Sequence, residues 1–308
     1  MPSTFPEVWL KRVIFIITSL VSAPWLDGIP ELDVAVVEMG SGSASELNAI
    51  HIPVETFEAD VLINNTTYPI ASQAFEDGEV IVQLDKYQTK VTTLSDDQII
   101  GASYSKIDSV TGSHTRAMLK NKYRKAIHAL APAADTTDTP ILVATGDEVT
   151  AGGRRLFTYA DMVAAKNKLD QMECPEEGRR LVLSTDHYND LLIGVDKNSM
   201  ATLLADINKG KVAPMIAGFE IYSYLGNPYF SQNEDDEWEK NPFGAVVSGT
   251  DRKASVFFLT KNVAKKTGMT KQYFAKADTD PATQTNRLNY RHYFIALPMK
   301  QKYCGAIV

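Results

Sequence analysis

The chain has 308 residues, a formal net charge of −7 and 44% hydrophobic residues. With 22% charged residues, this composition is typical of a globular protein and excludes the disordered and collagen-like classes. The negative charge argues against a protein whose whole surface binds nucleic acid, because phosphate binding requires a cationic footprint. The only two cysteines, Cys174 and Cys304, exclude a disulfide framework and favour a reducing compartment.

The segment 11–26, KRVIFIITSLVSAPWL, admits two interpretations. Two cations, an apolar run and small residues resemble a secretory signal, which would make the mature chain a secreted β-rich binding protein. The run is too short to span a bilayer, so no membrane partner is expected. The second interpretation is an apolar arm that docks onto another molecule.

Residues 27–94 read mainly as strands. LDVAVVE and NAIHIPVETF flank a flexible GSGSAS turn, and a polar ribbon follows from Val61 to Val91. Glu76-Asp77-Gly78 predicts a turn inside that ribbon. Because the ribbon is polar on both faces near its end, we expect a hairpin that is exposed to solvent or paired with another subunit.

A long helix is predicted from Ser95 to Leu130. Ser95 and Gln98 have the spacing of a capping box, and about 35 residues at about 1.5 Å each give a rod of about 50 Å. Its two apolar stripes do not lie on one face, which predicts a kink at 111–113. Its second half carries a basic strip, interpreted as a solvated face or as a weak polyanion contact: Arg116, Lys120, Lys122, Arg124 and Lys125.

The remainder has the pattern of a compact α/β region. Thr158 is the expected N-cap of a helix that Pro175 follows, and 230–242 reads as an acidic surface loop. The expected strands are 139–145, 179–185, 218–224 and 288–308, and the expected helices are 158–171, 186–192, 198–207 and 253–268.

No catalytic, cofactor-binding or metal-binding motif emerges from the residues. The five histidines are well separated and lack the spacing of metal ligands. Asp186 and His187 with Asp190 are better explained as a helix N-terminus carrying favourable acids than as an acid–base cluster. The acidic run from Glu234 to Glu239 lacks EF-hand spacing, which favours a solvated loop over a calcium site. No cofactor is predicted.

Several phrases, in chain order, resemble the major capsid proteins of tailed bacteriophages. FPEVW (5–9) is similar to the start of that family's N-terminal arm, and GSASELNAIHIP (42–53) to the segment that leads into its hairpin. DMVAAKNKLDQMECPEEGRRLVLSTDHYNDLL (161–192) is the strongest likeness, and IAGFEIYSY resembles a strand of the axial domain. The likeness covers nearly the whole chain.

The resemblance implies an α+β chain with the Hong Kong 97-type fold. Its expected parts are an N-terminal arm (1–55), an extended E-loop β-hairpin (56–94), a long spine helix (95–132), a peripheral domain (133–195 and 285–308) and an axial domain (196–284).

The function that the resemblance implies is structural rather than enzymatic. The chain would self-assemble into hexamers and pentamers of an icosahedral phage head that encloses double-stranded DNA, in the cytoplasm of a bacterial host. Expected partners are other copies of itself, a separate scaffolding protein, a portal, decoration proteins, and DNA through weak nonspecific contact. An encapsulin-like nanocompartment shell remains the alternative within the same fold.

The resemblance also implies which residues meet a neighbouring subunit. The arm and E-loop would contribute Trp9, Val13, Phe15, Tyr68, Phe75, Lys86, Tyr87 and Lys90. The residues that would face DNA are Arg116, Lys120 and Arg124. One branch of the family places a cross-linking lysine in the E-loop, but the sequence identifies no asparagine partner or catalytic carboxylate.

Overall fold

The computed structural model describes residues 23–32, 37–38, 48–55, 77–95, 106–147, 153–194, 215–279 and 282–308. The chain divides into a large unit, 1–31 with 86–308, and a small unit, 32–85. The helix predicted at 198–207 lies outside the described residues. Within the described part, no helix is both long and apolar enough to span a membrane.

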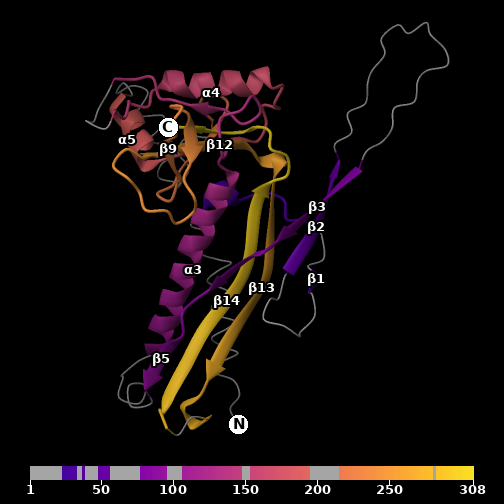
Figure 1. Ribbon diagram of the computed structural model, residues 1–308, viewed down its shortest axis with the longest axis vertical. Helices are drawn as coiled ribbons and strands as arrows, with labels where there is room; N and C mark the ends of the chain where they lie inside the picture. The colour runs from indigo at the N-terminus through magenta and orange to yellow at the C-terminus, as the bar shows by residue number, and fades with distance from the viewer. Residues whose placement is uncertain are drawn as a thin grey trace, which may run out of the picture. The chain divides into compact units, whose positions relative to one another are not determined.

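The small unit is an antiparallel sheet of β1 (Val37–Glu38), β2 (Asn48–Glu55) and β3 (Asp77–Gln83), in the order β1-β2-β3 (Figure 1). This pairing differs from the predicted hairpin, because β3 pairs with β2, which precedes the expected 56–94 segment. The predicted turn at Glu76-Asp77-Gly78 is wrong, because Asp77 pairs with Glu55 and Gly78 with Val54. Their composition favours a turn locally, but pairing across to β2 keeps them in the strand.

The long elements of the large unit lie side by side. Strands β13 (Val263–Ala275) and β14 (Thr285–Pro298) form an extended antiparallel pair, and β14 also pairs with β4 (Asp85–Gln88) and β5 (Thr92–Ser95). Helix α3 (Lys106–Leu130) packs along β14 (Figure 1). The polar end of the predicted ribbon is thus an edge of this sheet.

The start of the long helix differs from the prediction. Ser95, the expected N-cap, is the last residue of β5 and pairs with Thr285. Helix α3 also continues through 111–113, where the kink was expected. Here the buried contacts are polar rather than apolar: Thr115 donates to the Thr111 carbonyl at 2.8 Å, and the Thr111 hydroxyl lies 3.3 Å from that of Tyr290. Because polar side chains occupy this part of the buried face, the two apolar stripes need not lie on one face of the helix, and α3 forms without a kink at 111–113.

A five-stranded sheet forms the α/β part of the large unit. Its order is β6-β15-β12-β7-β8, with β6–β15 and β7–β8 parallel and the central pairs antiparallel. Thr158 and Asp161 form the capping box of α4, as predicted. The elements are β6 (Ile141–Leu142), α4 (Tyr159–Gln171), β7 (Arg179–Leu183), α5 (Thr185–Gly194), β8 (Glu220–Ser223), β12 (Ser255–Leu259) and β15 (Cys304–Ile307).

The predicted helix at 253–268 is wrong. Residues 253–268 instead form the end of β11 (Arg252–Lys253), all of β12, the short helix η2 (Thr260–Asn262) and the first residues of β13. Every residue of β12 is buried between β15 and β7, and a short apolar run suits a buried strand as well as a helix. The terminal strand is likewise divided into β14 and β15.

The predicted acidic loop is partly a hairpin. Strand β9 (Tyr229–Gln232) pairs with β10 (Trp238–Lys240), and residues 233–237 form the turn between them. Strand β11 pairs with the other edge of β9, and a last short helix, η3 (Ala277–Thr279), leads out of β13.

Two apolar cores hold the large unit together. One joins α3 to β14 through residues such as Ile127 and Tyr290, and the other joins α4 to the five-stranded sheet through Met162 and Phe257. The strand pairing crosses the domain boundary expected at 284/285, because β13 precedes it and β14 follows it. The assignment of peripheral and axial parts stays a prediction.

Candidate assembly surfaces

Residues 23–31, here called the anchor segment, are inserted into the large unit. The short helix η1 (Pro24–Leu26) places Trp25 in the main core, where it is 0% exposed and its ring centroid lies 5.5 Å from that of Tyr224. Ala23, Leu26 and Ile29 are buried with it. Sequence reasoning missed this segment, although its pattern of apolar residues closed by Asp27-Gly28 was a signal.

Hydrogen bonds hold the anchor segment at both ends. The Arg180 guanidinium on β7 donates to the carbonyls of Trp25 and Asp27, at 2.9 and 2.5 Å. On β13, the Lys265 ammonium donates to the Leu26 carbonyl at 3.1 Å, and the Thr267 hydroxyl to the Glu31 carboxylate at 3.1 Å. The chain that precedes Ala23 therefore starts from a fixed point on the large unit.

Five residues predicted to contact a neighbouring subunit lie outside the described residues: Trp9, Val13, Phe15, Tyr68 and Phe75. The other three, Lys86, Tyr87 and Lys90, lie in the large unit, on or directly after β4, and not in the β2–β3 hairpin as expected. Lys86 and Lys90 are exposed, whereas Tyr87 is half-buried and packs against the main core of its own chain.

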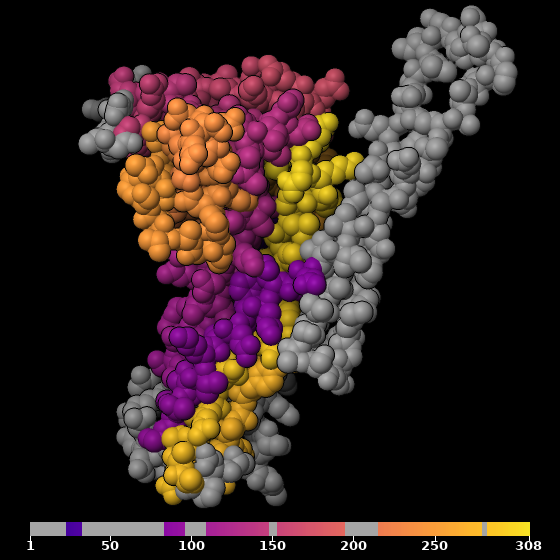
Figure 2. Space-filling model, viewed as in Figure 1, coloured from indigo at the N-terminus to yellow at the C-terminus, as the bar shows by residue number. Residues whose placement is uncertain are grey.

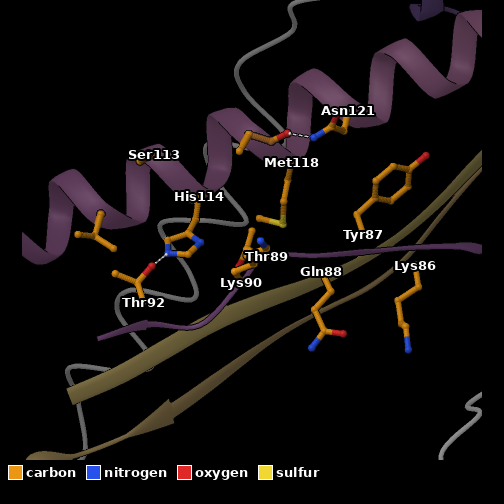
Figure 3. Close-up of a pocket in the computed structure, with 12 residues that line it drawn as sticks. Lys86, Tyr87, Gln88, Thr89, Lys90, Thr92, Ser113, His114, Met118 and Asn121 are labelled. Atoms are coloured by element: carbon orange, nitrogen blue, oxygen red, sulfur yellow. Dashed lines mark hydrogen bonds between the residues drawn. The ribbon is translucent and has the colours of Figure 1, made fainter. Parts of the chain in front are cut away.

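A cavity of about 560 Å³ lies between the β4–β5 segment and α3 (Figure 3). Tyr87 points toward α3, whereas Lys86 and Gln88 point to the other side of their strand. The His114 Nε2 lies 2.9 Å from the Thr92 hydroxyl, and burial lowers the pKa of His114. No carboxylate or thiol from the described residues lines this cavity.

A buried cation lies between α3 and the β13–β14 pair. The Lys122 ammonium is 3.3 Å from His292 Nε2 and 4.1 Å from the centroid of the Phe294 ring. Because an ammonium only donates, His292 Nε2 accepts, and His292 Nδ1–H donates to the Thr270 hydroxyl at 2.9 Å. Burial lowers the pKa of Lys122 to about 8; burial and the adjacent ammonium lower that of His292 to about 3.

We expect Lys122→Met to stabilise the protein at pH 7. The folded pKa of Lys122 lies below its unfolded value, so its contribution to stability falls as pH falls from 10.5 toward about 8. A buried methionine avoids this penalty, and the free energy of unfolding should rise by about 1–3 kcal/mol at pH 7, with a smaller gain at pH 10. Urea unfolding at both pH values measures this, with Lys120→Met on the exposed face as control. A loss of stability at pH 7 would contradict it.

Three cations of α3 follow a single face: Arg116 and Lys120 are exposed, and Arg124 is half-buried. Arg116, Lys120 and Arg124 are spaced at four residues and line a second cavity, of about 360 Å³, together with Tyr224 and Leu225. Lys122 was predicted to belong to the same strip, but it is only 6% exposed and lies on the opposite side, toward β14. The exposed strip is therefore narrower than expected.

His187 and Asp190 of α5 are held by residues of other segments. Arg154 forms a two-pronged ion pair with Asp190, at 2.5 and 3.1 Å, and the Phe157 amide donates to the same carboxylate. His187 Nδ1 lies 2.8 Å from the Ser255 hydroxyl, and its ring stacks on that of Phe157. Across the described residues, no group of three or more potential metal ligands occurs.

The structure combines a small three-stranded sheet that forms a unit of its own, an anchored N-terminal segment and a helix face that carries cations. The chain belongs to the phage capsid protein family, whose model, described as "Phage capsid protein", matches residues 77–308. It is a structural major capsid protein with the α+β, Hong Kong 97-type fold. No curated protein matches the chain.

Solved structures share the fold at low sequence identity. A capsid chain of cyanophage P-SCSP1u is 14% identical, with a TM-score of 0.59 over 91% of this chain and 90% of that one. A chain of Mycobacterium phage Che8 is 13% identical (TM-score 0.55; 91% and 97% covered). A virus-like particle from Pyrococcus furiosus is 9% identical (TM-score 0.56; 98% of each chain covered). The fold alone does not distinguish a phage capsid from a nanocompartment shell. The assignment to the phage capsid proteins therefore rests on the family match.

Proposed function

We propose that the chain assembles into hexamers and pentamers of a closed icosahedral head around double-stranded DNA, in the cytoplasm of a bacterial host. The observation that carries this proposal is the β2–β3 hairpin, which belongs to a unit of its own. Among the described residues, β1 adds two residue pairs to β2, so the β2–β3 pair is close to an isolated hairpin, which is marginally stable in water; contacts with neighbouring subunits are its expected source of stability. A scaffolding protein, a portal and decoration proteins are the proposed further partners.

The proposed mechanism is associative and conformational. Each subunit contributes apolar burial at about 25 cal/mol per Å², summed over several neighbours. The unpaired edges of the hairpin are a hazard in a monomer but can pair with or lie over an adjacent copy in a shell. Maturation would tilt the subunits as rigid bodies. Packaged DNA would make weak, nonspecific contact, since the chain carries a net charge of −7.

The hairpin can be shortened without disturbing its strand pairing. Glu55 and Asp77 are directly paired, so an Asn-Gly turn can replace residues 56–76. The shortened chain is expected to fold, with the unfolding transition of the large unit unchanged, but to form no closed shells. Size exclusion and negative-stain electron microscopy measure the assembly.

A second variant, with a Gly/Ser linker of the original length in place of 56–76, separates the role of the sequence from that of loop length. It is also expected to fold and to form no closed shells. Closed shells at the wild-type yield from both variants would contradict the proposal.

A further inference from the structure

A groove runs along α3 where the β9–β10–β11 region lies against it. The cavity beside Arg116 and Lys120 adjoins another of about 430 Å³ that reaches Phe243 and Val247, and the two share Arg124, Leu225 and Gly226. We call this continuous surface the α3 groove. In Figure 2 the β9–β11 region (orange) lies against the upper part of α3 (magenta).

The α3 groove exposes large apolar side chains. Among the residues that line it, Leu225 is 68% exposed, Val247 48% and Phe243 45%. A contiguous apolar patch rimmed by polar residues marks an interaction site in a soluble protein. The Gly226 position shows how closely the groove wall packs, because a Cβ there would clash with the Tyr224 ring and the Arg124 side chain.

The rim of the α3 groove is cationic. Arg116, Lys120 and Arg124 line it from α3, and Lys253 from β11. Among the ion pairs formed between described residues, none involves the three α3 cations. Four cations around an apolar floor select an anionic partner.

The same chain carries a compact anionic surface, the acidic tip, at residues 234–237. Its four carboxylates, from Glu234, Asp235, Asp236 and Glu237, are all exposed. The Asn233 side-chain oxygen accepts the amides of Asp235 and Glu237, each at 2.9 Å, which fixes the turn. A turn held in this way loses little conformational entropy on binding.

The acidic tip and the α3 groove lie at opposite ends of one hairpin. Tyr229 and Asn241, at its base, line the groove, whereas the tip begins five residues after Tyr229, just beyond the end of β9, or at most about 16 Å away at about 3.3 Å per residue. The base is fixed to α3, because the Lys240 ammonium donates to the His128 and Ala131 carbonyls at 2.8 and 2.6 Å. The tip therefore cannot fold back into the groove of its own chain.

We propose that the α3 groove of one subunit binds the acidic tip of a second copy; this inference rests on the proposed assembly function. Because the two complementary surfaces differ and lie apart on one chain, the contact is heterologous, and such contacts form rings when the rotation between neighbouring subunits closes. The sequence analysis instead named three residues of this groove, Arg116, Lys120 and Arg124, as a weak contact with DNA. Its exposed apolar floor favours protein over DNA, since nonspecific phosphate binding uses cations without an apolar pocket.

A charge-reversal cycle tests the pairing. Arg116→Glu with Lys120→Glu should raise the concentration required for assembly by more than about tenfold, as should Glu234→Lys with Asp235→Lys, because each places like charges opposite each other. Combining all four substitutions should restore assembly. Lys168→Glu, an exposed site on α4, controls for net charge and should leave assembly unchanged. Analytical ultracentrifugation and negative-stain electron microscopy give the readout, and circular dichroism confirms folding.

Two outcomes would overturn the inference while leaving the proposed function intact. One is normal assembly of the Arg116→Glu, Lys120→Glu variant. If its shells form normally but retain less DNA, the cations of the groove contact DNA rather than a second subunit. The other is a loss of assembly that the tip reversal fails to restore, which would assign the groove to a different partner. A wild-type chain that forms no oligomer under any condition would contradict the proposed function and the inference with it.

Discussion

Replacing Trp25 with alanine is expected to lower the free energy of unfolding of the large unit by about 3 to 5 kcal/mol. The side chain is 0% exposed and packs in the main core, so its removal leaves a cavity between the anchor segment and α3. Its indole nitrogen has no hydrogen-bond partner among the described residues, so the loss comes from packing alone. Release of the anchor segment from β7 and β13 should accompany the change.

Urea unfolding measures the loss, and limited proteolysis between Ala23 and Glu31 measures the release. Tyr159→Ala is the matched control, because that aromatic side chain is 58% exposed and its truncation should change stability by less than about 0.5 kcal/mol. Equal effects of the two substitutions would show that the anchor segment does not contribute to the core.

Mild acid is expected to destabilise the fold well above the pH at which carboxylates titrate. Burial lowers the pKa of His187 to about 4 and contributes most to lowering that of His292 to about 3, whereas both have ordinary values near 6.5 in the unfolded chain. The unfolded state therefore binds more protons below pH 6.5, and stability falls as pH falls. Each histidine should lower the free energy of unfolding by about 2 kcal/mol as the pH falls from 8 to 5.

Denaturant unfolding at half-unit steps from pH 8 to pH 5 measures the slope of the unfolding free energy against pH. His187→Gln and His292→Gln should each lower the overall stability but make the slope shallower, by up to about 1.4 kcal/mol per pH unit. The slope is the diagnostic quantity, because a purely structural effect would shift the whole curve without changing its steepness. A wild-type stability that stays constant down to pH 5 would contradict the assigned protonation states.

The β7 region shows what local chemistry determines. Thr158 and Asp161 cap α4 through bonds that close within four residues, and Gly178 takes a φ of 87° in the turn before β7. These signals depend on neighbours in sequence, so α4, β7 and α5 could be predicted, and with them the phrase that carries the family resemblance. The capsid fold itself was predicted from the resemblance of several such phrases, in chain order, over nearly the whole chain.

Contacts between distant segments decided the rest. The apolar run of β12 became a strand because β7 and β15 cover it on both edges, and Lys122 differs from its neighbour Lys120 because only one of them faces β14. Tyr87, predicted to contact a neighbouring subunit, also packs against its own core, and the α3 groove joins residues more than a hundred positions apart. A sequence pattern indicates which residues share one face of a helix or strand. Whether those side chains are buried, charged or hydrogen-bonded depends on the segment that packs against that face.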